Sequence, residues 1–275
     1  MKKYTWEEAV LWLRNNRSQQ ELVKACYYDD PIEAAAERYY QSEEWQSVQC
    51  LLKSKFPCRV LEIGAGRGIS SYSFAKDNCE VFAFEPDNSN VVGSGCIRQI
   101  NSRVGYSINI IESLDNLISE NQKFDIIFCR AVLHHIPDLF VFFSNVKSLL
   151  NKDGVFLAVR EHLLKEKKHL QTFLDNHPLH SLYGGENAFT LEEYLKYTHL
   201  VPFRRLTVYF NYEKAFNYYP DSKSQVLDKL QDWVNKKSFL YRIMHFFPFF
   251  RRKLLRKMSD DLYFPGIHIG FLASK

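Results

Sequence analysis

A carboxylate followed by a glycine-rich turn is the first group of residues with an evident chemistry. Residues 60–68 read Val-Leu-Glu-Ile-Gly-Ala-Gly-Arg-Gly, an apolar run that ends in an acid and turns before the next helix. This order is typical of cofactor sites at the carboxyl edge of a parallel sheet, where backbone amides and a helix N-terminus face the ligand. The predicted cofactor-binding residues of this segment are Glu62, Gly64, Ala65, Gly66 and Gly68.

The glycine spacing and the acid together indicate the kind of cofactor. The glycines form G-x-G-x-G and are followed by Ile69, whereas dinucleotide sites need G-x-G-x-x-G. A carboxylate at Glu62 would repel a pyrophosphate, but it would attract a ligand that carries an ammonium group and a sulfonium. S-adenosylmethionine is such a ligand.

A second acid suits the same ligand. The apolar residues 80–84 are followed by Glu85 and Pro86, and Glu85 lies 85 − 64 = 21 residues beyond Gly64. Nucleotide cofactors find a ribose partner at about this separation, roughly 20 residues after the turn. We therefore expect the Glu85 carboxylate to accept hydrogen bonds from the ribose hydroxyls, with Pro86 beside it.

These stretches and two later ones resemble a known family, the class I S-adenosylmethionine-dependent methyltransferases. The later stretches are residues 124–135, Phe-Asp-Ile-Ile-Phe-Cys-Arg-Ala-Val-Leu-His-His, and residues 150–159, which begin Leu-Asn-Lys-Asp-Gly. The resemblance covers roughly residues 55–161. It implies S-adenosylmethionine as the cofactor and an α/β, Rossmann-like methyltransferase sheet. That sheet is parallel with an antiparallel last strand, expected here at residues 266–273.

Alternating apolar strands and helical patterns predict a parallel sheet independently. Strands are expected near residues 59–63, 80–84, 107–112, 124–129 and 155–160. Residues 1–54 are predicted to form a helical extension, because they carry capping signals such as Thr5 with Glu8 and Ser18 with Glu21. The methyltransferase domain should then span residues 55–275, with helical insertions at 162–200 and 213–262.

The resemblance implies roles for further residues. Extensions of this kind fold over the cofactor as a lid, so Tyr27, Tyr28, Arg38, Tyr39 and Tyr40 are either wall residues or simple helix packing. Ser113 and Leu114 follow the third strand, where family members contact adenine. Arg130 ends the fourth strand and would border the methionine end of the cofactor or anchor a substrate carboxylate or phosphate. His134 and His135 are interpreted as packing residues more than as catalysts.

An oxygen nucleophile needs a base to remove its proton, and two segments offer one. Glu161 and His162 leave the fifth strand over the expected site, and His177 and His180 lie in the loop 177–187. That loop is rich in groups that bind polyols, although solvation and turn formation explain its composition equally well. Together with residues 160–162 it resembles a group of uncharacterised bacterial class I methyltransferases, some of which act near polysaccharide assembly.

The positive charge of the chain is confined to one segment. Eight basic residues and no acid occur between Lys236 and Lys257, and the other 28 basic residues are outnumbered by 32 acidic ones. Phenylalanines are interspersed with these cations, and three interpretations are open. The segment is a plain helical hairpin, a surface within 236–258 that binds an anionic membrane, or, less favoured, a surface that binds nucleic acid.

Composition favours a cytoplasmic enzyme, peripheral to the inner membrane face if this segment binds lipid. The N-terminus lacks an apolar signal region, and the six cysteines lack C-x-x-C spacing, so we expect reduced thiols and no metal site. The favoured function is methylation of an oxygen on a small or lipid-linked acceptor such as a saccharide. The alternatives are an RNA or protein methyltransferase, supported only by the basic segment, and a non-catalytic cofactor-binding partner subunit. A base N-methyltransferase is disfavoured, because residues 130–133 read Arg-Ala-Val-Leu instead of Asn/Asp-Pro-Pro-Tyr/Phe.

Overall fold

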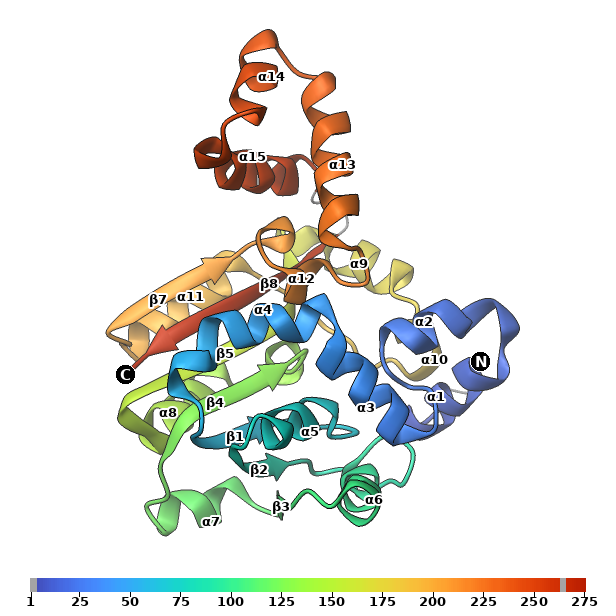
Figure 1. Cartoon of the computed structure of the whole chain (residues 1–275), viewed down its shortest axis with the longest axis vertical. Coiled ribbons are helices and arrows are strands. Elements are labelled where there is room, and N and C mark those ends of the chain that lie inside the picture. Colours follow the sequence, from blue (N-terminus) through green and yellow to red (C-terminus); the bar gives the residue numbers. More distant parts are fainter. Residues whose placement is uncertain (1–3, 263–265) are drawn as a thin grey trace.

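A single mixed sheet of eight strands forms the centre of the computed structural model, which describes residues 4–262 and 266–275 (Figure 1). Its order is β3-β2-β1-β4-β5-β8-β7, and β6 pairs with β5 beside this path. The first six strands pair in parallel, whereas β8 is antiparallel to β5 and β7. The strands are β1 (Arg59–Ile63), β2 (Glu80–Phe84), β3 (Ile108–Ile111), β4 (Phe124–Arg130), β5 (Leu150–Leu164), β6 (Phe189–Thr190), β7 (Arg205–Tyr209) and β8 (Ile267–Ser274). The predicted α/β sheet with an antiparallel last strand is confirmed.

Each face of the sheet carries its own core, because successive strand residues point to opposite faces. Val60 belongs to one core and its neighbour Leu61 to the other. The first core contains side chains of α3 (Ile32–Gln41), α4 (Glu43–Leu52), α5 (Ile69–Lys76) and α6 (Ser94–Val104). The second contains side chains of α7 (Leu114–Ser119), α8 (Leu139–Leu149) and α11 (Leu191–Leu200). The carboxyl ends of the parallel strands are left for a site.

The N-terminal segment is helical, as its capping signals predict. It forms α1 (Trp6–Asn15) and α2 (Gln20–Ala25) ahead of α3 and α4, and the capping box between Thr5 and Glu8 is present. The predicted box at Ser18 is wrong. Asn16 accepts the Ser18 backbone N–H and holds a short 3₁₀ turn, so α2 begins later, at Gln20, without a side-chain cap.

Strand β5 is longer than the sequence predicts. It continues past residue 160 because His162 pairs with His268 on β8 and Leu163 pairs with Phe189 on β6. The β5–β8 register shifts between Ala158 and Glu161, and Arg160 within this shift has a φ of +60°. A bulge of this kind redirects the side chains that follow it. It therefore decides which residues after the bulge face the site.

The 162–200 insertion packs against the N-terminal helices. It contains α9 (Leu170–Asn176) and α10 (His180–Tyr183) before α11. The backbone N–H of Tyr4 donates to the Leu182 carbonyl at 3.0 Å, and the rings of Trp6 and Tyr183 lie 4.8 Å apart. Two segments that are distant in sequence thus meet beside the sheet and close one side of the space there.

The second insertion projects away from the sheet (Figure 1). After α12 (Ala215–Tyr218) it forms α13 (Lys223–Asn235), α14 (Phe239–His245) and α15 (Pro248–Asp261). A small core of its own holds these three helices together, formed by Leu230, Trp233, Val234, Leu254 and Met258. Over the residues that the structure describes, every helix is too short or too polar to cross a membrane.

Candidate active site

A cavity of about 870 Å³ opens at the carboxyl ends of β1, β2 and β4 and alongside β5. This volume lies within the range of small-molecule sites, roughly 300–1,000 Å³. Seven of the ten predicted cofactor residues line it: Glu62, Gly64, Ala65, Gly66, Glu85, Pro86 and Arg130. Histidines line the other end. The two ends of the cavity are described in turn.

The glycine turn has a backbone that other residues adopt only with strain. Gly64 and Gly66 have φ values of +69° and +52°, in the left-handed region that favours glycine. A Cβ on Gly64 would lie 2.6 Å from Val132 Cγ2, whereas a Cβ on Gly66 would meet only the Val92 carbonyl, at 3.8 Å. The backbone at Gly66 is therefore open to close approach by a ligand.

Gly68 has a structural part in the same turn. It caps the start of α5 with a φ of +77°, and a Cβ there would lie 2.7 Å from Ile97 Cγ1 on α6. It is not among the residues that line the cavity. Packing of α5 against α6 requires a glycine at this position. The spacing of the motif alone does not show whether a glycine serves helix packing or ligand contact.

Two acids frame the cofactor end. Glu62 is buried, with 1% of its surface exposed, and the Ser71 hydroxyl donates to its Oε2. Burial raises the pKa of Glu62 to about 7, although hydrogen bonds from Ser71 and Ser70 oppose this rise. A cation in the cavity would stabilise the charged form of such a carboxylate. The residues therefore fit the ammonium group of the predicted cofactor.

Glu85 is positioned by the turn itself. Its Oε2 accepts the Gly66 N–H at 2.6 Å and its Oε1 accepts the Asp87 N–H at 2.9 Å. Burial raises the pKa of Glu85. The carboxylate is thus fixed beside the open backbone of Gly66, where the predicted ribose contact requires it.

Arg130 lines the cavity, but its charge is already paired. Its Nε donates to Glu44 Oε1 at 2.7 Å and its Nη2 to Glu44 Oε2 at 3.2 Å. Glu44 on α4 is fully buried. Glu44 Oε2 also lies 3.9 Å from Arg160 Nη1, so two guanidinium groups that line the cavity share one buried carboxylate.

The N-terminal helices form one wall through a contact that the sequence reading missed. Arg67, inside the glycine turn, donates to the Tyr27 carbonyl at 2.6 Å, to the Asp29 carbonyl at 2.8 Å and to the Asp30 carboxylate. Tyr27 and Tyr28 line the cavity as expected for wall residues. The other three candidates, Arg38, Tyr39 and Tyr40, do not line it.

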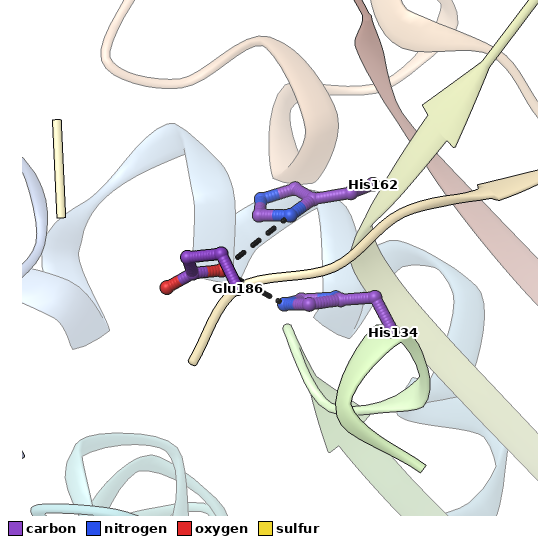
Figure 2. A group of neighbouring side chains, drawn as sticks. All are labelled: His134, His162 and Glu186. Atoms are coloured by element: carbon purple, nitrogen blue, oxygen red, sulfur yellow. Dashed lines mark ion pairs between the residues drawn. The ribbon is translucent and has the colours of Figure 1, made fainter. Parts of the chain in front are cut away.

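The far end of the cavity is a cluster of histidines around one acid. Figure 2 shows the His134 and His162 rings one above the other, with the Glu186 carboxylate beside them, and the ring centroids lie 4.0 Å apart. Glu186 Oε2 lies 3.7 Å from His134 Nε2, 3.7 Å from His162 Nδ1, 3.9 Å from His135 Nε2 and 3.9 Å from His177 Nε2. The cluster joins residues from the short 3₁₀ turn Leu133–His135 after β4, from β5 and from the 162–200 insertion.

Glu161 supports this cluster from behind. It is fully buried, does not line the cavity, and accepts hydrogen bonds from the N–H of Val132 at 3.0 Å and from His134 Nδ1 at 2.9 Å. Burial raises the pKa of Glu161 to about 7. We expected Glu161 and His162 both to face the substrate, but neighbouring strand residues point to opposite faces, so only His162 does.

Burial keeps three imidazoles of the cluster neutral. It lowers the pKa of His134 to about 3, lowers that of His162 well below its usual value, and lowers that of His177. The Nδ1–H of His134 donates to Glu161, which leaves Nε2 as an acceptor directed at Glu186. Neutral imidazole nitrogens of this kind can accept a proton or bind a cation.

The remaining predicted residues lie at the margins. His177 lines the cavity, whereas His180 on α10 does not. Ser113 caps α7 by accepting the Asp115 N–H, and neither it nor Leu114 lines the cavity, so their adenine contact stays a prediction. His134 was interpreted as a packing residue. The adjacency of β4 and β5 could have shown that it meets His162.

Comparisons with known proteins agree with the geometry of the cofactor end. A family model described as a methyltransferase domain matches residues 25–197. The ubiquinone biosynthesis O-methyltransferase of Paramagnetospirillum magneticum is 25% identical over 136 residues, which cover 49% of this chain and 53% of that protein. The chain thus spans about half the length of this curated relative.

Two solved structures share the fold. The O-methyltransferase from a trans-AT PKS multienzyme of Brevibacillus brevis, in complex with S-adenosyl-L-homocysteine, has a TM-score of 0.53 at 13% identity, covering 100% of this chain and 81% of that one. The phosphoethanolamine N-methyltransferase 2 of Haemonchus contortus, in complex with S-adenosyl-L-methionine, has a TM-score of 0.52 at 17% identity, covering 84% and 52%.

Proposed function

This chain belongs to the class I S-adenosylmethionine-dependent methyltransferases, and from that premise we propose that it methylates an oxygen of a small or lipid-linked acceptor, such as a saccharide. One observation carries the proposal. A single cavity joins the acidic glycine turn to a group of histidines that includes the half-buried His177. An oxygen acceptor needs a proton acceptor in this position, because its hydroxyl loses a proton as it attacks.

The residues divide the work between the two ends. Bound S-adenosylmethionine supplies a methyl group on a sulfonium, which is a good leaving group. Glu62 holds the ammonium end, Glu85 holds the ribose, and the Gly66 backbone allows close approach. His177, which is half-buried and neutral, takes the hydroxyl proton of the acceptor. The helical wall with Tyr27 and Tyr28 excludes water. Holding the acceptor oxygen in line with the methyl group supplies much of the rate.

The choice of oxygen has support from a relative as well as from the histidines. The match to a ubiquinone biosynthesis O-methyltransferase concerns an enzyme named for transfer to oxygen. A saccharide acceptor is supported by the polar side chains of the loop 177–187, of which Glu186 and His177 line the cavity.

A methyl-transfer assay tests this function. The full chain is incubated with methyl-labelled S-adenosylmethionine and separate fractions of glycans, lipid-linked saccharides, RNA and protein. We expect acid-stable label on oxygen in a saccharide-containing fraction. His177→Ala should lose transfer while S-adenosylhomocysteine affinity is unchanged, and the exposed His199→Ala is the matched control. Label in RNA or protein alone would overturn the proposal.

We also propose that the projecting hairpin contacts an anionic membrane, where a lipid-linked acceptor would reside. Phe239, Phe246 and Phe249 are 75%, 78% and 90% exposed. In a plain hairpin these phenylalanine side chains would enter the core, and here they do not. Exposed aromatic side chains beside cations favour binding at a membrane surface with anionic headgroups. Each basic residue near that surface contributes about 1 kcal/mol to binding.

Vesicle sedimentation tests the hairpin. Wild type should sediment with vesicles that contain anionic phospholipid and not with purely zwitterionic ones. Changing Phe246 and Phe249 to Ser should abolish sedimentation, and charge reversal of basic residues within 251–257 should do the same. Charge reversal of the exposed Lys165, Lys167 and Lys168 is the control. A wild-type chain that stays in the supernatant would contradict membrane contact.

A further inference from the structure

We propose that His134, His162 and Glu186 bind a divalent transition-metal ion, with zinc as the first candidate. Their three ligand atoms lie within 4.8 Å of one another, and all three residues are buried. The metal binding itself is independent of the proposed function. Only the role of the ion, described below, rests on it.

The unsatisfied oxygen of Glu186 is the first argument. Its Oε1 accepts the Tyr183 hydroxyl at 2.5 Å, but its Oε2 is buried without a hydrogen-bond partner among the residues that the structure describes. A buried carboxylate oxygen without a partner carries a free-energy penalty. Its nearest imidazole nitrogens lie 3.7 Å away, which is too far for a hydrogen bond. Something that fits between these atoms would remove the penalty.

A metal ion fits this spacing. Zinc lies about 2.0–2.1 Å from imidazole nitrogen and carboxylate oxygen, so tetrahedral ligand atoms are about 3.4 Å apart. The two 3.7 Å separations from Glu186 Oε2 therefore need small inward movements, and the His134 and His162 rings, which stack with centroids 4.0 Å apart, tilt so that both nitrogens face the ion. In Figure 2 one nitrogen of each of the two stacked rings faces the Glu186 carboxylate, and the three side chains come from different segments.

The surroundings of His134 are those of a metal ligand. Glu161 accepts the His134 Nδ1–H at 2.9 Å, which fixes the tautomer with Nε2 free. Such carboxylate–histidine pairs orient metal-binding imidazoles and increase their basicity. His162 has a competing contact, because its Nδ1 lies 3.2 Å from the Asn187 carbonyl. It gives up this hydrogen bond when the nitrogen binds the ion.

The donor set indicates the class of metal. Two imidazole nitrogens and one carboxylate oxygen suit zinc and other first-row transition ions, whereas magnesium and calcium prefer oxygen ligands alone. Two histidines and a glutamate also form a known open zinc set, in which the fourth position is left for water or substrate. Here His177 and the cavity adjoin that position.

The role follows if the proposed function is correct. The ion would hold the acceptor oxygen and make its hydroxyl easier to deprotonate, and His177 would then take the proton. Under this arrangement His134 positions the acceptor and does not act as the base. The ion stays at the histidine end and is separate from Glu62 and Glu85.

Titration of the chelator-treated full chain with zinc, and with cobalt for its visible spectrum, tests the site. We expect about one ion per chain with the spectrum of a four- or five-coordinate site. His134→Ala, His162→Ala and Glu186→Ala should each weaken binding at least about 100-fold, and Glu161→Gln about 10–100-fold. His199→Ala is the control and should bind as wild type does.

Binding of S-adenosylhomocysteine by each variant reports on folding, and Glu186→Gln replaces any alanine variant that fails this check. A wild type that binds none of zinc, cobalt, nickel, manganese or iron would overturn the site, as would variants that keep wild-type affinity. Zinc binding without methyl transfer would retain the site and remove the proposed function. Methyl transfer that survives complete zinc removal would refute the role of the ion.

Discussion

The two ends of the cavity are built in different ways. The cofactor end is mostly backbone and two acids, and its turn comes from one continuous run of sequence, residues 62–68. The histidine end is made of side chains from three separate places, His134, His162 and the 177–186 segment. A backbone-made subsite tolerates few changes, because its shape depends on the fold itself. A side-chain subsite can change its ligand by substitution alone.

The energetics of the two ends also differ. At the cofactor end Glu85 accepts two backbone hydrogen bonds, and the Arg130 charge is paired with Glu44. At the histidine end Glu186 Oε2 is buried without a hydrogen-bond partner among the described residues, and in the wall of the cofactor end the same holds for Tyr27 Oη and Arg67 Nε. The two acids therefore differ: the Glu85 carboxylate is held in place before a ligand binds, whereas the Glu186 carboxylate lacks a partner for one oxygen until a ligand binds. Variants at each end should therefore affect different measurements.

The largest effect is expected at the histidine end. His134→Ala should lower kcat by about 10³-fold, as expected for loss of a ligand to the ion that would hold the acceptor oxygen. Cofactor affinity should stay within twofold of wild type, because His134 lies at the histidine end of the cavity and the cofactor is held by Glu62 and Glu85 at the other end. Steady-state kinetics and calorimetry measure the two quantities. A matching loss of cofactor affinity would break the division between the two ends.

The glycine turn should give the next largest effect. Gly64→Ala places a Cβ 2.6 Å from Val132 at a φ of +69°, so unfolding free energy should fall by about 1–3 kcal/mol and cofactor affinity with it. Gly105→Ala is a matched control, since Gly105 has a φ of +74° with nothing within 4 Å of an added Cβ. Both variants share the backbone strain of a positive φ, but only Gly64→Ala adds a steric clash, with Val132. Denaturant titration and calorimetry of the two variants should separate these contributions. Equal effects of the two variants would contradict this interpretation.

Glu85→Ala should weaken S-adenosylhomocysteine binding by at least about 1 kcal/mol, the value for a lost charge-assisted hydrogen bond. The exposed Glu80→Ala, at the other end of the same strand, is the control. Metal affinity should be unchanged in both variants. Calorimetry with each ligand gives the result, and tight NAD binding by wild type would refute the cofactor assignment.

The smallest effect is a pH dependence at Glu62. Burial raises its pKa to about 7 in the free protein, and a bound ammonium group would lower it again. Binding therefore releases a proton below pH 7, so affinity should rise up to tenfold per pH unit as pH rises toward 7, then level off. In the free protein the same shift makes stability fall as pH rises from about 4.5 to 7. Glu62→Gln should flatten the affinity profile, and an unchanged slope in this variant would contradict the role.

Several elements could be predicted closely from sequence because buried parallel strands are continuous apolar runs. The first two strands were predicted at residues 59–63 and 80–84, and both are confirmed. The end of β5 was not predicted correctly, because its extension depends on pairing with β8, which lies more than 100 residues later in the chain. That extension and the bulge at Arg160 decide that His162, and not Glu161, faces the cavity.

Sequence by itself determined the fold class, the cofactor and seven of the residues that line the cavity, because a strand, a turn and a helix start are local structures. Tertiary structure alone decided the histidine end. Whether Glu186 meets His134 depends on how the 162–200 insertion packs against the sheet and the N-terminal helices. Such contacts between distant segments follow from packing and burial across the whole domain, and no local spacing encodes them.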